Sequence, residues 1–281
     1  MNTRAALLGG ALLLLAASVA GWRLHLRVAG GYTLEAAAPV AVMSDLPIPP
    51  VPSRIVDGAE YDSCLDMLTT DPWAAAKFAE AWKAAGGDGA AHCLALSTVA
   101  MGDADLGAAM LEQLADASTA PPVVRAAIYG QAAEAWMEAD EAQRAHTAAS
   151  LALALSPEDV ELLIGRAAAS AALDRHADSE ADLTRALDLD SGRIDALVLR
   201  GTAWRHLGQL ARAQDSLDRA LAQDPDSPEA LLERGILRQR DGDDAGARQD
   251  WERAVALSPD SATADLAQQN LALLEAGPHQ R

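Results

Sequence analysis

Apolar residues recur along the second half of the chain at the spacing of amphipathic helices, and this pattern repeats every 34 residues from Ala126. Each of the four copies has a small residue at one position and an alanine at another: Ala133, Ala167, Gly201 and Gly235, and Ala152, Ala186, Ala220 and Ala254. A period of this length is typical of stacked helical hairpins.

The copy at 194–227 shows how one unit is built. Trp204 belongs to a first apolar helical face, Gly208 provides a turn, and Leu217 belongs to a second face. Pro225 then ends the second helix, because proline has no amide hydrogen to donate. One hairpin alone cannot bury its apolar face, so we expect four hairpins to stack, over 126–159, 160–193, 194–227 and 228–261.

The last two copies resemble the tetratricopeptide repeat family. The resemblance rests on Gly201, Trp204, Gly208, Ala213, Leu217, Ala220 and Pro225 in one copy, and on Leu231, Gly235, Gly242, Ala247, Trp251, Ala254 and Pro259 in the next. The earlier copies depart from it, for example at Ser179 and Ser191. It implies an all-α fold, a right-handed superhelical α-solenoid of antiparallel helix pairs, which usually serves as a scaffold.

Weaker helical segments flank the four copies. Gly102 marks the turn of a degenerate hairpin that ends at Pro121 and Pro122, and we assign 57–125 to an N-terminal helical cap that contains it. After the repeats, 262–277 is expected to form a C-terminal capping helix.

The first thirty residues differ in composition from the rest. Residues 5–20 are uncharged and mainly apolar, which suits a signal peptide, whereas a comfortable membrane span needs about 20 residues. Ser18 and Ala20 fit a cleavage site, but Arg23 just beyond it disfavours cleavage. Residues 1–29 are therefore interpreted as either a signal peptide or an uncleaved N-terminal membrane anchor.

Residues 30–56 are rich in proline, which favours extended backbone, and are interpreted as a linker. Together with the apolar segment, this linker predicts a bacterial envelope protein whose repeat domain is exported. The protein would be periplasmic or anchored to the inner membrane, and a cytoplasmic body is the less favoured alternative.

Cys64 and Cys93 are the only cysteines in the chain. Two thiols in an exported protein are candidates for one disulfide, which would tie the first helix of the cap to the third. The alternative is that both are buried free thiols that pack as small apolar residues.

The net charge of −19 argues against nucleic acid as a partner, because binding phosphates requires a basic face. The chain also lacks a phosphate-binding loop, a His-Glu-x-x-His zinc motif and a Gly-x-Ser-x-Gly nucleophile elbow. The acidic turn at Asp188 and Asp190 faintly resembles a calcium loop, but Leu199 replaces the acid expected near its end. We therefore expect no catalytic residue, no metal and no cofactor.

The resemblance implies that the first helix of each repeat lines a concave, partner-binding groove. Its expected residues are Glu134, Met137, Ile164, Val198, Thr202, Arg205, Leu232, Ile236 and Arg240. Because the acidic members come early and the basic members late, the groove is expected to run from acidic to basic. The alternative for the apolar members is that they pack between adjacent first helices. Lysine occurs only at Lys77 and Lys83, outside the repeats, so we do not expect a receptor for acidic chaperone tails.

These observations predict a non-catalytic adaptor or scaffold that binds a protein or peptide partner in the cell envelope through its groove. Contact with a membrane is expected only through the N-terminal segment. The alternative is a structural module that associates with itself as a homo-oligomer, or an accessory subunit of an envelope assembly complex.

Overall fold

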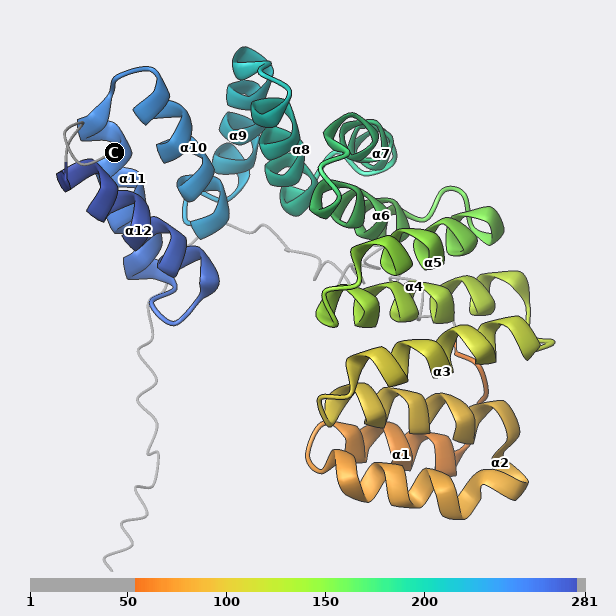
Figure 1. Cartoon of the computed structure of the whole chain (residues 1–281). Helices are drawn as coiled ribbons and strands as arrows, with labels where there is room; N and C mark the ends of the chain where they lie inside the picture. Colours follow the sequence, from red (N-terminus) through yellow and green to blue (C-terminus); the bar gives the residue numbers. More distant parts are fainter. Residues whose placement is uncertain (1–53, 277–281) are drawn as a thin grey trace, which may run out of the picture. The chain divides into compact units, whose positions relative to one another are not determined.

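The computed structural model describes residues 54–276, which form twelve α-helices and contain no strand (Figure 1). The helices are α1 (Ala59–Leu68), α2 (Pro72–Ala100), α3 (Ala104–Ala117), α4 (Pro122–Glu138), α5 (Ala142–Leu155), α6 (Val160–Ala172), α7 (His176–Leu189), α8 (Ile194–His206), α9 (Leu210–Gln223), α10 (Pro228–Arg240), α11 (Asp244–Leu257) and α12 (Ala262–Ala276). The expectation of an all-α solenoid of helix pairs is confirmed for these residues. The expected signal peptide or anchor at 1–29 and most of the linker at 30–56 lie outside them.

The helices of successive hairpins keep the 34-residue register of the sequence. We call α4, α6, α8 and α10 the first helices of the four hairpins and α5, α7, α9 and α11 the second helices. The later first helices begin at Val160, Ile194 and Pro228, and their second helices begin at His176, Leu210 and Asp244. Side chains cap several helix starts: Asp159 accepts a hydrogen bond from the amide of Leu162, and Ser227 accepts one from that of Ala230.

The first of the four hairpins departs from the predicted boundary at Ala126. Helix α4 begins at Pro122, about one turn earlier, so the division between 57–125 and 126–261 falls inside this helix. Pro122 opens α4 and does not end the preceding hairpin, because a proline in the first helical turn forfeits no intrahelical hydrogen bond. The preceding helix α3 already ends at Ala117.

Each of the four hairpins turns through one residue with a left-handed backbone. Gly208 (φ 72°) and Gly242 (φ 84°) hold this place in the last two hairpins, and Asp140 (φ 60°) and Asp174 (φ 58°) hold it in the first two. Aspartate tolerates this region better than most residues with a Cβ. The same turn is therefore made with either residue, which explains why the sequence pattern keeps its phase across the change.

The two helices of a hairpin pack closely where a small residue of the first faces a larger residue of the second. A Cβ atom placed on Gly201 would lie 2.9 Å from Cγ of Leu217, and one on Gly235 would lie 2.3 Å from Nε1 of Trp251. Leu217 and Trp251 are fully buried, and the Trp251 indole donates a hydrogen bond of 3.1 Å to the carbonyl of Leu232. Glycine on one helix thus makes room for the large side chain on the other.

Buried polar contacts also join the two helices within a hairpin. Arg234 in α10 binds both carboxylate oxygens of Asp250 in α11, at 2.9 and 2.7 Å, and Arg166 binds Asp182 in the same way in the second hairpin. In the third hairpin Arg200 meets only the Ser216 hydroxyl, at 3.2 Å. Desolvation lowers the pKa of Arg200, and the nearby Arg219 charge adds to that effect.

The N-terminal cap is built from α1, α2 and α3. Gly87 has non-helical backbone angles (φ 48°, ψ −127°) and divides α2 into two helical segments, so the break expected at this glycine is present. The second segment of α2 and helix α3 form the hairpin expected before the four regular copies.

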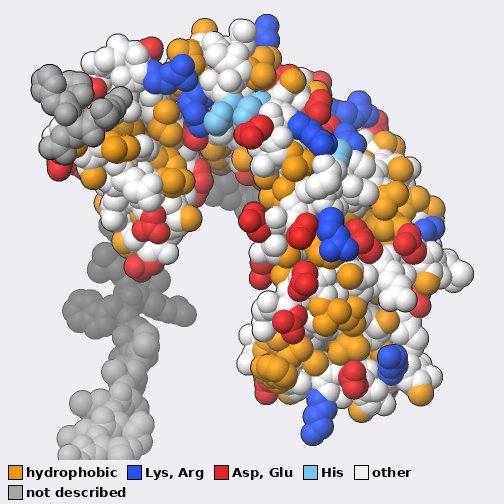
Figure 2. Space-filling model, viewed as in Figure 1, with side chains coloured by type: hydrophobic (Ala, Val, Ile, Leu, Met, Phe, Trp, Pro, Cys, Tyr) orange, Lys and Arg blue, Asp and Glu red, His pale blue; other side chains and the backbone are white. Residues whose placement is uncertain are grey.

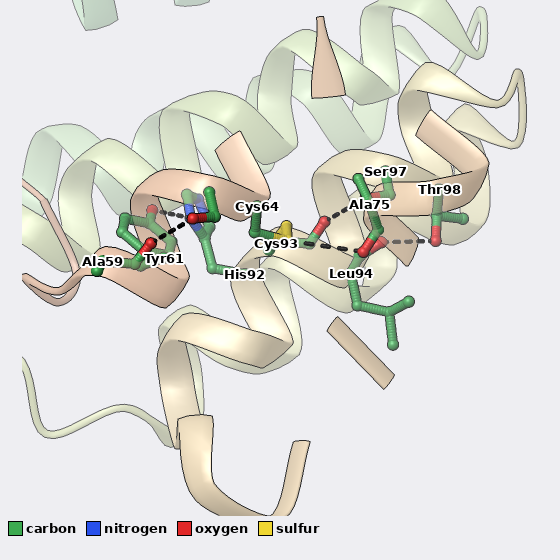
Figure 3. The surroundings of a disulfide bond; sticks show 10 residues. Ala59, Tyr61, Cys64, Ala75, His92, Cys93, Leu94, Ser97 and Thr98 are labelled. Atoms are coloured by element: carbon green, nitrogen blue, oxygen red, sulfur yellow. Dashed lines mark hydrogen bonds between the residues drawn. A yellow bond between two sulfur atoms is a disulfide. The ribbon is translucent and has the colours of Figure 1, made fainter. Parts of the chain in front are cut away.

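Two cross-connections hold this cap together (Figure 3). A disulfide joins Cys64 of α1 to Cys93 in the second segment of α2, and both residues are fully buried. Nearby, the Tyr61 hydroxyl lies 2.6 Å from Nδ1 of His92, whose Nε2 lies 2.6 Å from the Gln131 side-chain oxygen in α4. Burial lowers the pKa of His92, which fits a neutral ring that accepts from Tyr61 and donates to Gln131. The cap is thereby fastened to the first regular hairpin.

Two glycine substitutions should change stability in opposite directions. Gly235→Ala should lower the free energy of unfolding by about 1–3 kcal/mol, because its methyl group collides with Trp251. Gly165→Ala in α6 should raise it by about 0.5–1 kcal/mol, since an added Cβ meets nothing within 4 Å and alanine favours the helix. Urea unfolding followed by circular dichroism measures both. Equal effects of the two changes would contradict the packing described for Gly235.

Breaking the disulfide should weaken the cap more than the repeats. The bridge closes a loop between residues 29 apart in sequence, for which the chain-entropy model gives about 3–4 kcal/mol. Hydrogen exchange by mass spectrometry, with and without reductant, should show lost protection in 59–100 and unchanged protection in 228–257. Uniform loss along the chain, or none, would show that the bridge does not act locally. A Cys64→Ala/Cys93→Ala double variant should be insensitive to the reductant.

Candidate partner-binding groove

The first helices lie along one side of the row of hairpins. Helix α4 contacts α6, α6 contacts α8, α8 contacts α10, and α10 contacts α12. Direct contact keeps these helices close together, so the row curves with them on its inner side (Figure 1). Figure 2 shows this hollowed side, with acidic side chains along its edge beside α4 and α6.

Three apolar residues expected in the groove are almost withdrawn from solvent. Ile164 is 8% exposed, and Val198 and Leu232 are each 7% exposed. All three belong to the continuous hydrophobic core, so their burial favours the packing alternative between adjacent first helices.

The remaining expected residues differ in how accessible they are. Met137, Thr202 and Ile236 are partly buried, and the Thr202 hydroxyl donates a hydrogen bond of 3.1 Å to the carbonyl of Val198. Glu134 and Arg240 are exposed. The surface that a partner can touch is therefore narrower than the sequence rows suggested.

Arg205 forms an ion pair with another residue of the same chain. Its Nε lies 2.7 Å from Oε2 of Glu233 on α10, and the two side chains are only 16% and 12% exposed. This ion pair joins the third hairpin to the fourth. The Glu233 carboxylate compensates the positive charge of Arg205, which was expected at the basic end of the groove. Of the two basic residues expected at this end of the groove, only Arg240 is exposed.

His206, beside Arg205, lies in surroundings that disfavour its protonated form. Its ring stacks on that of His176, with centroids 4.1 Å apart. Burial lowers the pKa of His206, and the charges of Arg205 and His176 lower it further.

Acidic groups dominate the other end of the groove. Although Glu134 on α4 is exposed as a whole, partial desolvation of its carboxyl group raises its pKa, and the nearby charge of Glu161 on α6 raises it further. Glu161 is bound by Arg193, which also holds Asp195 at 2.6 Å. Among the ion pairs of residues 54–276, none includes Glu134, whereas its neighbour Glu161 pairs with Arg193.

Two hollows open between successive first helices. One, of about 670 Å³, lies where α8 and α10 begin and is lined by Ile194, Val198, Leu199 and Pro228 among others. The other, of about 290 Å³, lies between α4 and α6 above Ala149 of α5. Both linings are mainly apolar, as recognition of apolar side chains requires.

The described residues offer nothing for a metal and no membrane span. In 54–276, no group of three or more His, Cys, Asp or Glu side chains is placed to hold a metal ion. None of the helices in this range combines the length and the hydropathy needed to cross a bilayer.

Sequence reasoning missed Glu161, Arg193, Glu233 and Ala149. The three charged residues join first helices of different hairpins, at separations of 28 and 32 residues that no helical period marks. Ala149 could have been found by aligning the copies, because the same position holds Leu183, Leu217 and Trp251 in the others.

Arg205 and Arg240 should respond differently to truncation. Arg205→Ala should lower the free energy of unfolding by about 1–3 kcal/mol, because it leaves the mostly buried Glu233 carboxylate unpaired. Arg240→Ala removes an exposed arginine and should change it by no more than about 0.5 kcal/mol. Urea unfolding tests both, and a loss at Arg205 as small as that at Arg240 would contradict a structural role for the pair.

The comparisons with known proteins agree with this geometry. Residues 195–227 and 229–261, the third and fourth hairpins, match a family model described as tetratricopeptide repeat. No curated protein sequence matches the chain significantly.

Several solved structures share the fold at low sequence identity. The structure titled as a functional characterisation of Pseudomonas aeruginosa pilF has a TM-score of 0.60 at 14% identity, over 75% of this chain and 96% of that one. The Cut9-Hcn1 hetero-tetramer of APC/C gives 0.59 at 16%, over 75% of this chain and 42% of that one. A crystal structure of MamA gives 0.51 at 16%, over 59% of this chain and 95% of that one.

The third and fourth hairpins thus match the tetratricopeptide repeat, and the described part of the chain is a helical solenoid that shares its fold with the pilF structure.

Proposed function

We propose that this chain is a non-catalytic adaptor that binds a protein or peptide partner on the inner, first-helix side of its solenoid. The observation that carries the proposal is the inner surface itself, where two mainly apolar hollows open between first helices that ion pairs join to one another. A preformed surface of this kind costs little to order when a partner binds.

The cell envelope is the proposed location, with the repeat domain exported and the apolar segment at 5–20 serving as leader or anchor. The Cys64–Cys93 disulfide supports this location, since disulfides persist in oxidising compartments such as the bacterial periplasm. The proline-rich linker would let an anchored repeat domain stand away from the membrane.

A self-associating module, or an accessory subunit of an assembly complex, is the second candidate. Leu266 and Leu273 favour it, because these leucines on the terminal helix α12 are 50% and 55% exposed. The Cut9-Hcn1 neighbour is itself titled a hetero-tetramer. Concentration-dependent sedimentation of the pure chain distinguishes self-association from binding to another protein.

Site-specific photo-crosslinking in cells tests the adaptor proposal. A benzophenone amino acid at Thr202, on the inner side, should form a covalent adduct with a second protein. The same group at the exposed Asp215 of the second helix α9 should not. Adducts only from Asp215, or only with further copies of this chain, would contradict the proposal. Protease protection in spheroplasts and N-terminal sequencing of the adduct then test export and cleavage.

A further inference from the structure

One position in the second helices sets how much space remains beneath each first helix. Spaced by 34 residues, this position holds Ala149, Leu183, Leu217 and Trp251. In the fourth hairpin, Trp251 lies against Gly235 and reaches the carbonyl of Leu232. The first hairpin has alanine where the others have a leucine or a tryptophan, so it lacks a large side chain at this place.

The space left over is the hollow of about 290 Å³ between α4 and α6. Gly130, Ala133 and Ala149 line it, and Gly130 and Ala133 are the equivalents of Leu232 and Gly235, which Trp251 touches. On the α6 side, Leu162 reaches toward Gly130, where a Cβ would lie 2.6 Å from its Cδ2. Beside it, Gly165 and Ala168 leave the wall open, and a Cβ placed on Gly165 would meet nothing within 4 Å. The hollow thus borders the positions equivalent to those that the Trp251 side chain contacts in the fourth hairpin.

The rim of this hollow is acidic. Glu134 and Glu161 both border it, and only Glu161 is bound by an arginine of the described chain. No lysine or arginine of residues 54–276 forms an ion pair with Glu134, and partial desolvation together with the Glu161 charge raises the pKa of this carboxyl group. A bound positive group would lower the cost of keeping it ionised.

We infer that the hollow above Ala149 receives one large apolar side chain of the partner protein, with a lysine or arginine next to it that pairs with Glu134. The apolar side chain would occupy the position equivalent to that of Trp251 in the fourth hairpin. The lysine or arginine would be the cationic partner that Glu134 lacks within residues 54–276. This inference rests on the proposed function and adds to it the chemistry of the partner segment.

Three fluorescein-labelled nonapeptides of glycine and serine serve as probes, with binding to the full chain followed by fluorescence anisotropy. The first has a central tryptophan flanked by lysines, the second has alanine at the centre, and the third has glutamates in place of the lysines. The first should bind, with each of the others roughly tenfold weaker, because burying the indole and matching the acidic rim both favour it.

Variants of the chain locate the binding. Ala149→Leu fills the hollow and should weaken the tryptophan peptide about tenfold, while the midpoint of urea unfolding stays the same or rises. Ala181→Leu adds the same side chain at an exposed position of α7 and should leave binding unchanged. Glu134→Gln keeps the shape of the rim and should weaken only the lysine-flanked peptides, about threefold.

Three results would overturn the inference: no binding of the lysine-flanked tryptophan peptide, equal binding of all three peptides, or full binding by Ala149→Leu. Self-association of the pure chain that Ala149→Leu abolishes would also overturn it, since a second copy would then fill the hollow. Crosslinking from Thr202 distinguishes failure of the proposed hollow from failure of the adaptor function. If it persists in an Ala149→Leu chain and the peptides fail, the hollow is rejected and the adaptor function stands.

Discussion

Close approach of two helices through a small residue is the constraint on which the whole solenoid depends. Gly201 leaves space for Leu217, and Gly235 leaves space for Trp251. In these hairpins a small residue on the first helix is therefore paired with a large residue on the second helix. The row of hairpins buries one continuous hydrophobic core that extends from α2 to α12. A hairpin depends on its neighbours to cover its apolar face, and every change of size within a pair alters the space between the first helices as well.

The same cross-contacts decide how much of the inner side is left for a partner. Ile164, Val198 and Leu232 pack between first helices, and Arg205 pairs with Glu233, so these four of the residues expected to bind a partner belong to the scaffold. What remains open is small, mainly apolar and acidic at its rim near Glu134. Residues that the sequence pattern assigns to partner binding thus hold the first helices together. The surface that remains for a partner is where the packing between these helices is incomplete.

The N-terminal end of the described helices differs from the middle of the array, because within residues 54–276 no further hairpin packs on the outer side of α1 and α2. Helix α1 is tied to α2 by the Cys64–Cys93 disulfide, and the Tyr61–His92–Gln131 chain of hydrogen bonds ties both to α4. At the other end, α12 covers α11 and α10 through Ala264 and Ala267, and its outward side exposes leucines. One end is thus covalently fastened, whereas the other ends in a single helix.

The sequence by itself determined the period, the helix pairs and their turns, because these follow from local spacing and backbone preference that repeat with the copies. The 34-residue period is preserved even where Asp140 and Asp174 replace the turn glycine. The first helix α4, however, begins at Pro122, about one turn before the repeat boundary expected at Ala126. The sequence also singled out Glu134 and Met137, which border the hollow above Ala149. Only the tertiary structure decided that Arg205 is neutralised by Glu233, and that the short side chain of Ala149 leaves a hollow open to the inner side. The physical reason is that charge pairing and unfilled volume depend on side chains from different helices, whose distances no periodicity along the chain specifies.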